Sequence, residues 1–277
     1  MPSEAIYPER LQIDHSEVFE HLANAPIVEA VIQINGRVQG VWDEQATAKA
    51  FAAALPEYPT IQSMNAMHMT LDVQDPRASA ADATAQRLAP GEVMATQHVQ
   101  TGWMGVRLAS ADGKQIAVFT RDFFALSRLA AYEDWGTFRN EATRLWDVFV
   151  KLGKVEEVAR IGCRFINRVE VPLDGLEIRQ YFEGFAPPAG GFPFSSFLHH
   201  DVLTMPGHPY QVNLIRAHEP ALAQSMTLPL ILDIEAFCAE QSSLESANIP
   251  ERLADLRWIK NRVFFATVTK KLLDRCR

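Results

Sequence analysis

The residues best suited to chemistry are three arginines, Arg160, Arg164 and Arg168, in the segment RIGCRFINRVEVP. Successive side chains of a strand point to opposite faces, so a strand here places all three arginines on one face and Cys163 on the other. Arginines four residues apart on a strand stand roughly 13 Å apart, too far to share one small phosphate. Because guanidinium groups bind phosphates through paired hydrogen bonds, the row favours an extended anionic ligand.

Asn167 is the exception in this segment, because it is polar but lies on the apolar side. Either it is buried and hydrogen-bonded to backbone, or a bulge turns it outward beside Arg168. The candidate ligand-binding residues are Arg160, Arg164, Asn167 and Arg168. The competing interpretation is a ladder of ion pairs, because the segment LPLILDIEAF puts Asp233 and Glu235 on one side of a second strand.

Histidines offer a different kind of site, a metal centre. The candidates are His199, His200, Asp201, His208 and His218. Neighbours on a regular strand point to opposite faces, so His199 and His200 cannot both be ligands there. His15 and His21 are six residues apart, which fits neither one helix face nor a known ligand spacing. We therefore expect polar residues around an exposed hairpin and no bound metal.

The sequence gives little indication of a reactive nucleophile or of a cofactor-binding motif. Cys163 lies between Ile161 and Phe165 on the apolar side of its strand, where burial would raise its pKa and suppress its reactivity. The chain has no G-x-x-x-x-G-K-[ST], G-x-G-x-x-G, H-E-x-x-H, C-x-x-C or G-x-S-x-G motif. The sequence thus predicts no cofactor and no catalytic residue, and it favours a protein without enzymatic activity while leaving that question open.

Composition bounds the class of protein. The chain has 277 residues, 48% of them hydrophobic, and a net charge of −8, so any binding of nucleic acid needs a local basic patch. Three widely separated cysteines fit free thiols in a reducing compartment. The start, MPSEAIYPER, does not have the pattern of a signal peptide, and no apolar run approaches about 20 residues. We expect a soluble cytoplasmic protein that makes no contact with a membrane.

The elements that position the arginines alternate in type. In the first half, the sequence pattern predicts a strand at 25–36, a short helix at 45–55 and strands at 61–73, 93–110 and 115–126. A helix at 133–153 follows, with a stripe of Trp135, Phe138, Ala142, Leu145, Trp146 and Phe149 and with Gly153 at its C-terminal cap. Residues 75–92 are a Pro- and Ala-containing insertion.

The second half repeats that order. After the arginine segment come a short helix at 176–185 and strands at 195–204, 210–219 and 228–237. In the closing helix, Asn248 serves as N-cap, Pro250 is tolerated in the first turn and Glu251 completes a capping box. Its buried stripe is Leu253, Leu256, Ile259, Val263, Phe264, Val268 and Leu272.

The predicted fold is α+β, with two pseudo-repeated β-α-β-β-β-α halves whose antiparallel sheets carry helices on one face. Residues 1–22 form a flexible N-terminal arm, 23–153 the first half and 154–277 the second, as one compact unit. The two sheets could join edge to edge, giving a saddle with the topology of the TATA-box-binding protein, or stack face to face.

Three segments carry a resemblance: NAPIVEAVIQI, the stretch containing YEDWGTFRNEATRLW, and RIGCRFINR. Together they resemble a sporadically distributed bacterial family of conserved hypothetical proteins of similar length. The resemblance covers most of the chain and implies no assigned activity, cofactor or catalytic residue. It implies a context among mobile or defence-associated genes.

Three functions remain open. The first is a non-enzymatic binding or regulatory module that docks a partner protein, or an anionic polymer such as nucleic acid, on an exposed sheet face. The second is an enzyme or sensor for a small phosphorylated ligand held by the arginine strand. The third is a scaffolding or oligomer-forming subunit, suggested by the aromatic residues of segments such as GFPFSSF. The sequence leaves the oligomeric state undetermined.

Overall fold

Strands β1 (Ile27–Asn35) and β7 (Arg160–Pro172) lie side by side and antiparallel within a large sheet. The structure is a computed structural model that describes residues 9–40, 42–74, 94–186, 190, 192, 194–219 and 226–277. Within these residues, nine strands form one antiparallel sheet in the order β2-β3-β4-β5-β1-β7-β10-β9-β8. The two halves therefore join edge to edge through β1 and β7.

The other elements complete this frame. The remaining strands of the large sheet are β2 (Thr60–Gln74), β3 (Met94–Ala109), β4 (Gln115–Thr120), β5 (Phe123–Leu129), β8 (Leu198–Thr204), β9 (Tyr210–His218) and β10 (Thr227–Cys238). Strands β6 (Glu157–Val158) and β11 (Ser242–Ser243) pair separately. The helices are α1 (Glu44–Ala54), α2 (Trp135–Gly153), α3 (Ile249–Thr267) and α4 (Lys270–Leu273), with a 3-10 turn η1 at Ile178–Gln180.

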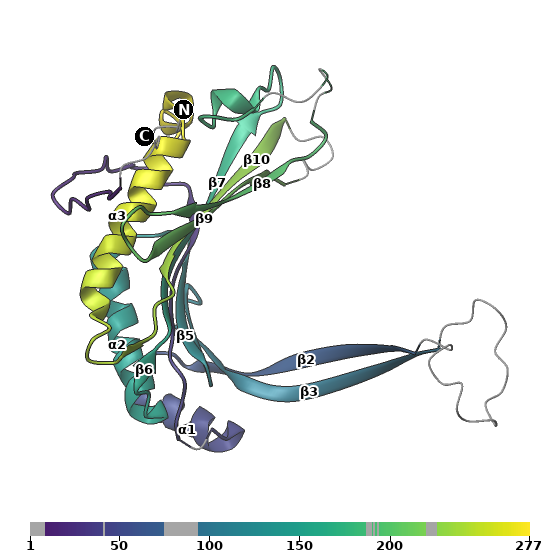
Figure 1. The fold of residues 1–277 in the computed structure, drawn as a ribbon, viewed down its shortest axis with the longest axis vertical. Coiled ribbons are helices and arrows are strands. Elements are labelled where there is room, and N and C mark those ends of the chain that lie inside the picture. The colour runs from purple at the N-terminus through teal and green to yellow at the C-terminus, as the bar shows by residue number, and fades with distance from the viewer. Residues whose placement is uncertain are drawn as a thin grey trace.

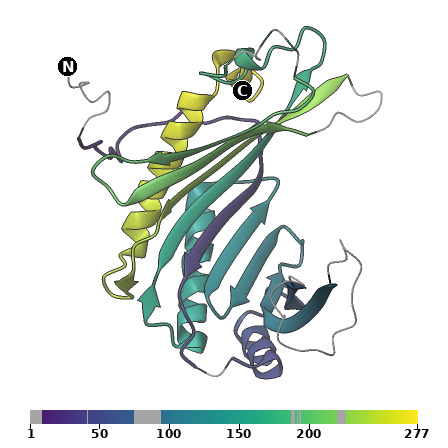
Figure 2. The same cartoon turned by 45° about the vertical axis from the view of Figure 1, so that its right-hand side comes forward.

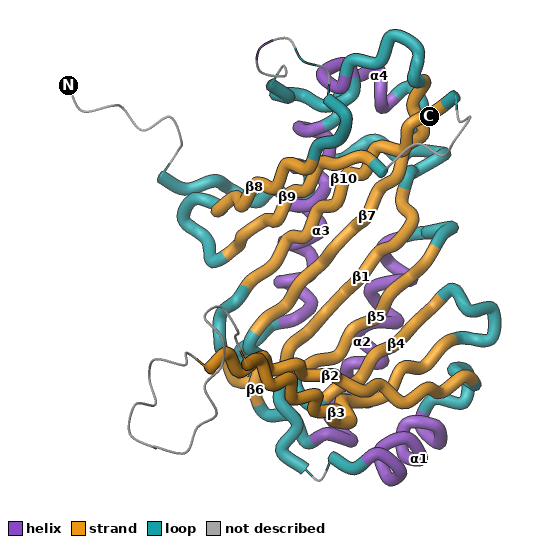
Figure 3. The backbone as a smooth tube through the Cα atoms, turned by 90° about the vertical axis from the view of Figure 1, so that its right-hand side faces the viewer, coloured by secondary structure: helices purple, strands orange, loops and turns teal. Residues whose placement is uncertain are grey.

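Helices α2 and α3 lie along the convex side of the curved sheet, and the β2–β3 hairpin projects from one end (Figure 1). Helix α1 packs on the same side as α2, because Phe51 stacks on Phe119 of β4 with ring centroids 4.1 Å apart. Figure 2 shows the strands of the second half crossing α3 at an angle. Figure 3 looks at the opposite side, where the strands lie in front of the helices. We call this side, which no helix of the described part covers, the uncovered face.

Helix α2 follows its sequence pattern closely. All six residues of the predicted stripe are buried, and the Asp134 side chain caps the helix by accepting a hydrogen bond from the Thr137 amide at 2.9 Å. The C-terminal cap is Lys154, which takes the left-handed conformation (φ 52°), so the prediction of Gly153 as cap is wrong. Gly153 serves packing instead, because a Cβ there would lie 2.9 Å from Val38.

Helix α3 departs from prediction at its start. Asn248 is the N-cap by position, but its φ is 42° and its side chain makes no capping hydrogen bond to the helix. The Asn248 amide instead bonds the Glu251 carboxylate, so the reciprocal capping box does not form. Burial follows the predicted stripe, except that Val263 is only partly buried and α3 ends at Thr267, before α4 carries the buried Leu272.

The α+β class with one antiparallel sheet and helices on one face is confirmed. The strand predicted at 115–126 is two strands, because the Thr120 hydroxyl accepts hydrogen bonds from the Asp122 and Phe123 amides and closes a tight turn. The helix predicted at 176–185 shrinks to η1. The insertion at 75–92 lies outside the described residues, and the internal duplication stays a prediction.

Residues 9–22, predicted as part of a flexible arm, pack against the second half, whereas residues 1–8 lie outside the described part. The Leu11 amide donates to the Pro206 carbonyl at 3.1 Å, and Phe19 stacks on Phe265 of α3 with centroids 5.7 Å apart. The Trp258 indole donates to Glu17 at 2.8 Å. Residues 9–22 are therefore packed on the second half and do not form a free arm.

Candidate functional site

The arginine row, Arg160, Arg164 and Arg168, points to the uncovered face of β7, as the alternation of the strand predicts. Cys163 and Phe165 are fully buried on the other side, against α3. The register places β10 beside β7, with Glu235 opposite Arg164 and Asp233 opposite Ile166. The strand that the competing interpretation required is thus the direct neighbour of the row.

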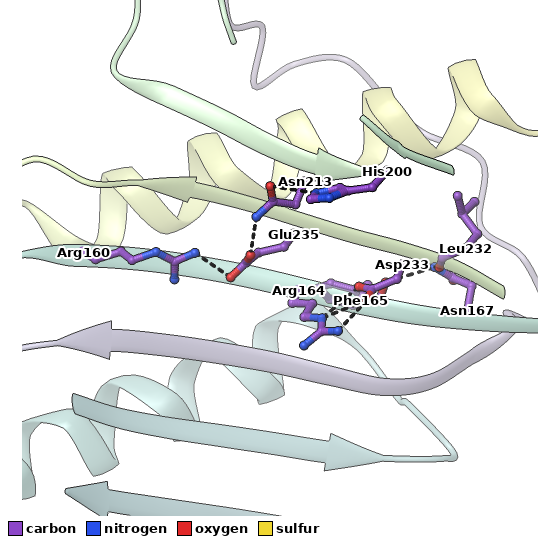
Figure 4. A network of polar contacts seen from close by, with 9 residues as sticks. All are labelled: Arg160, Arg164, Phe165, Asn167, His200, Asn213, Leu232, Asp233 and Glu235. Atoms are coloured by element: carbon purple, nitrogen blue, oxygen red, sulfur yellow. Dashed lines mark hydrogen bonds and ion pairs between the residues drawn. The ribbon is translucent and has the colours of Figure 1, made fainter. Parts of the chain in front are cut away.

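Each arginine of the row is paired with acids, and Figure 4 shows the pairs made by Arg160 and Arg164. Arg164 holds Asp233 through three hydrogen bonds, from Nε to Oδ1 at 2.9 Å and to Oδ2 at 3.1 Å, and from Nη2 to Oδ2 at 2.5 Å. Arg160 Nη2 donates to Glu235 Oε1 at 2.6 Å, and its guanidinium lies 4.3 Å from the Phe237 ring centroid. The ion-pair ladder to Asp233 and Glu235 is therefore present.

The third arginine has different partners. Arg168 contacts Glu170 at 2.6 Å and Glu219 at 3.1 Å, and all three side chains are substantially exposed. Surface pairs of this kind contribute little to stability, about 0–1 kcal/mol. The acids of the ladder, Asp233 and Glu235, are 9% and 23% exposed, whereas Glu170 and Glu219 beside Arg168 are 42% and 50% exposed.

The pairing shifts the proton affinities of the ladder. Burial raises the pKa of Glu235, but hydrogen bonds from Arg160 and from Asn213 outweigh burial and hold that pKa below its usual value. The hydrogen bonds to Asp233 raise the pKa of Arg164. Both groups therefore stay charged at neutral pH, and the ladder is electrically neutral where it is least exposed.

Asn167 does not belong to the row. Its side chain is on the covered side and is 3% exposed, and its Nδ2 donates to the Leu232 carbonyl at 2.9 Å and the Phe165 carbonyl at 3.3 Å. The bulge in this region lies on β1, around Val28, and leaves the alternation of β7 intact. The inclusion of Asn167 among the ligand-binding candidates is corrected accordingly, and the alternative of a buried, satisfied amide holds.

The histidines of the predicted hairpin serve local contacts. His199 stacks on Phe185 on the covered side, while His200 lies on the uncovered face beside Asn213. Asp201 on the covered side binds Arg216 at 2.6 Å. Among the described residues, no three His, Cys, Asp or Glu side chains gather in a way that could hold a metal ion.

Beneath the row, the covered side of β7 holds a lysine that the sequence analysis did not single out. Lys260 of α3 places its Nζ 3.9 Å from the centroid of the Phe165 ring, and no carboxylate of the described residues is within ion-pair distance. Burial, with a smaller contribution from the neighbouring Arg257, lowers the pKa of Lys260 to about 8. Burial likewise raises the pKa of the Cys163 thiol to about 12, so that thiol is unreactive.

A separate cavity lies at the start of α3. This cavity, the arm pocket, has a volume of about 760 Å³ and lies between the N-terminal segment, the β8–β9 turn and α3. Its lining includes Arg10, His15, His208, Tyr210, Arg252 and Asp255. Asp255 is its centre, because one carboxylate oxygen contacts His15 Nε2 at 2.8 Å and the other accepts from the Tyr210 hydroxyl.

Spacing could not reveal this cluster. His15 and Asp255 are 240 residues apart in the sequence. His15 was discounted because its spacing from His21 fits no known site, but the fold supplies Asp255 as its partner. Burial, then the hydrogen bond to Asp255, raise the pKa of Tyr210 well above its usual value, so the phenol stays protonated. Gly207 permits the arrangement, because its φ is +74° and a Cβ there would lie 2.7 Å from Arg10.

A second hollow adjoins the Arg168 end of the row. It has a volume of about 480 Å³ and is lined by Asn24, Pro26, Arg168, Val169, Glu170, Arg275 and Cys276. Arg275 has no acidic partner among the described residues. Two arginines thus border this hollow, one ion-paired and one without a counter-charge.

Comparisons with protein-family models and with curated proteins find no match for this chain. The resemblance based on the three sequence segments therefore stays a prediction. No helix of the described residues is both long enough and apolar enough to cross a membrane.

Proposed function

We propose that the protein is a binding module that docks a partner protein on its uncovered face. The observation that carries this proposal is the one-sided layering of the sheet, with α1, α2 and α3 on one side and bare strands on the other (Figure 3). An antiparallel sheet can face water on one side at no unusual cost. The feature that favours docking is the curvature, which gives the bare side a concave shape that a convex partner would fit.

The charge on this face favours a protein over an anionic polymer. Its described strand residues carry four arginines and four acids: Arg107, Arg160, Arg164 and Arg168 against Glu29, Glu170, Asp233 and Glu235. Nucleic acid binding draws its affinity from uncompensated cations that replace counterions. A neutral ladder offers none, whereas mixed charges suit the polar contacts of a protein interface.

Apolar side chains between the charges support the same conclusion. Ile166 lies between Arg164 and Arg168 on the uncovered face, and Ile231 stands opposite Arg168 on β10. Both are only partly buried. A partner would bury them and surround them with the ladder, which resembles the apolar centre and polar rim of known interfaces.

The test is purification of the tagged protein from its own host, compared with a variant carrying Ile166→Glu and Ile231→Glu. We expect a stoichiometric protein to copurify with the wild type and to be reduced at least about tenfold with the variant, because an unpaired charge would be buried. Circular dichroism checks that the variant folds. The matched control is Leu152→Glu, an apolar-to-acid change at a 40% exposed position on α2.

Identical copurifying proteins from all three samples would refute docking on this face. Loss of the bound material on nuclease treatment would instead identify a nucleic acid and refute the protein partner. A decisive result needs the partner to depend on Ile166 and Ile231 but not on Leu152.

A second candidate function is an enzyme or sensor for a small phosphorylated ligand at the Arg168 end of the row. The hollow between Arg168 and the unpaired Arg275 favours it. Calorimetric titration with inorganic phosphate and pyrophosphate tests this candidate. Binding that is lost in Arg275→Gln but kept in Arg179→Gln, which alters an exposed arginine elsewhere, would support it. Absence of heat with both anions would exclude it.

A further inference from the structure

Strand β8 ends the large sheet and has unusual side chains for an edge. Its outer side pairs with no strand of the described residues. Three of its seven residues are exposed and apolar: Leu198 is 69% exposed, Val202 61% and Leu203 41%. Edge strands normally carry Lys, Pro or outward charges that block pairing with another chain. The sequence LHHDVLT has no lysine or proline, and its single acid, Asp201, is held by Arg216.

We propose that two copies of this chain pair antiparallel through β8, with His200 of one copy opposite His200 of the other. Such a contact is isologous, because the same strand serves both sides of a two-fold axis. The axis stands perpendicular to the sheet, so the two sheets continue into each other and both uncovered faces look the same way. The proposal is independent of the partner protein proposed above.

The faces of the sheet restrict the possible registers. Residues directly opposite in an antiparallel pair share a face, so the two-fold axis must pass between two copies of the same residue. Leu198, His200 and Val202 lie on the uncovered face, and His199, Asp201 and Leu203 on the covered one. A slip of one residue therefore changes every pair across the interface.

The register centred on His200 is the most complementary. It sets Leu198 opposite Val202 of the second copy, twice, and His199 opposite Asp201 of the second copy, also twice. Apolar side chains that stand directly opposite each other on two strands stabilise the pairing of those strands. A register centred on Asp201 would bring two carboxylates together, and one centred on Val202 would set Asp201 opposite Leu203. The matching positions of the exposed Leu198 and Val202 within β8 thus favour a second copy over an unrelated strand.

Cysteine cross-linking tests both the dimer and its register. Directly opposite residues of an antiparallel pair have Cα atoms about 4.5–5.5 Å apart, within reach of a disulfide. We expect His200→Cys to give a covalent dimer under mild oxidation and Asp201→Cys to give little. The native Cys163, Cys238 and Cys276 are all buried, so they add little background. Efficient cross-linking of Asp201→Cys with none for His200→Cys would overturn the proposed register.

The oligomeric mass provides the second readout. In sedimentation velocity, the wild type is expected at twice 31.0 kDa, and Leu198→Lys with Val202→Lys at 31.0 kDa with an unchanged circular dichroism spectrum. The control is Met226→Lys, which replaces an apolar residue 78% exposed outside β8 and should stay dimeric. A monomeric wild type at the highest attainable concentration would overturn the proposal. A dimer that persists in the double lysine variant would overturn it equally.

Discussion

Replacing Lys260 by Met should stabilise the protein at neutral pH. The folded state lowers the pKa of this lysine from 10.5 to about 8. Since one pKa unit corresponds to about 1.4 kcal/mol, keeping the ammonium charged in the fold costs about 3 kcal/mol. The contact with the Phe165 ring at 3.9 Å returns about 1–2 kcal/mol of this cost. Met fills a similar volume without charge, so we expect a net gain of about 1–2 kcal/mol near pH 7.

The stability difference between the wild type and Lys260→Met should depend on pH. Between about pH 8 and 10.5 the unfolded chain holds a proton on Lys260 that the folded chain has released. The free energy of unfolding of the wild type therefore rises with pH in this window. The advantage of Lys260→Met is full below about pH 8 and disappears near pH 10.5.

Urea denaturation of both proteins at about pH 7 and pH 10 measures this difference, with the midpoint and slope fitted at each pH. Lys270→Met is the matched control, because the Lys270 side chain is 81% exposed and its replacement should change stability little. A destabilised Lys260→Met variant at neutral pH, or a stability difference equal at both values, would refute a desolvated ammonium at this site.

Three further perturbations test the ladder, the N-terminal segment and the core amide. Arg164→Gln should cost about 1–3 kcal/mol in thermal unfolding, because it leaves the Asp233 carboxylate buried and unpaired; an unchanged melting temperature would contradict the ladder. Gly207→Ala should cost about 1–2 kcal/mol and speed tryptic cleavage after Arg10, since the turn is left-handed and crowded; unchanged cleavage would mean that the segment is held by other contacts. Asn167→Asp should cost about 3 kcal/mol or more, because a carboxylate cannot donate to the two carbonyls that Asn167 bonds; a neutral effect on urea unfolding would place its side chain in water.

The fold was largely predictable because most helices and strands show the regular spacing of apolar residues that is typical of their type. The stripe of α2 and the alternation of β7 needed only local spacing, and both hold in the structure. The turn between β4 and β5 was missed because the prediction treats Arg121 and Asp122 as polar positions of one continuous strand, whereas the Thr120 hydroxyl closes a turn there. The capping box at Asn248 failed because its two side chains bond each other.

Among the candidate sites, the ladder could be predicted from the sequence, whereas the arm pocket and Lys260 could not. The ladder could be anticipated because charges at a period of two on two strands must meet if the strands are neighbours. The arm pocket could not, because His15, Tyr210 and Asp255 come from three segments that only the packing of the N-terminal segment brings together. The environment of Lys260 could not be predicted, because the side chain contacts Phe165 across the interface between helix and sheet. The spacing of residues along the sequence does not indicate that contact.

The junction of β1 and β7 has a consequence for how the chain can be divided. A fragment that stops at Gly153 keeps α2 but loses β7, and so leaves the full hydrogen-bonding edge of β1 open to water. The complementary fragment from Lys154 would open the matching edge of β7, with Ile161, Cys163 and Phe165 no longer beside β1. Each fragment would therefore carry an adhesive edge that pairs with whatever strand it meets. We expect the halves to aggregate when expressed apart and to recover the native sheet only when coexpressed.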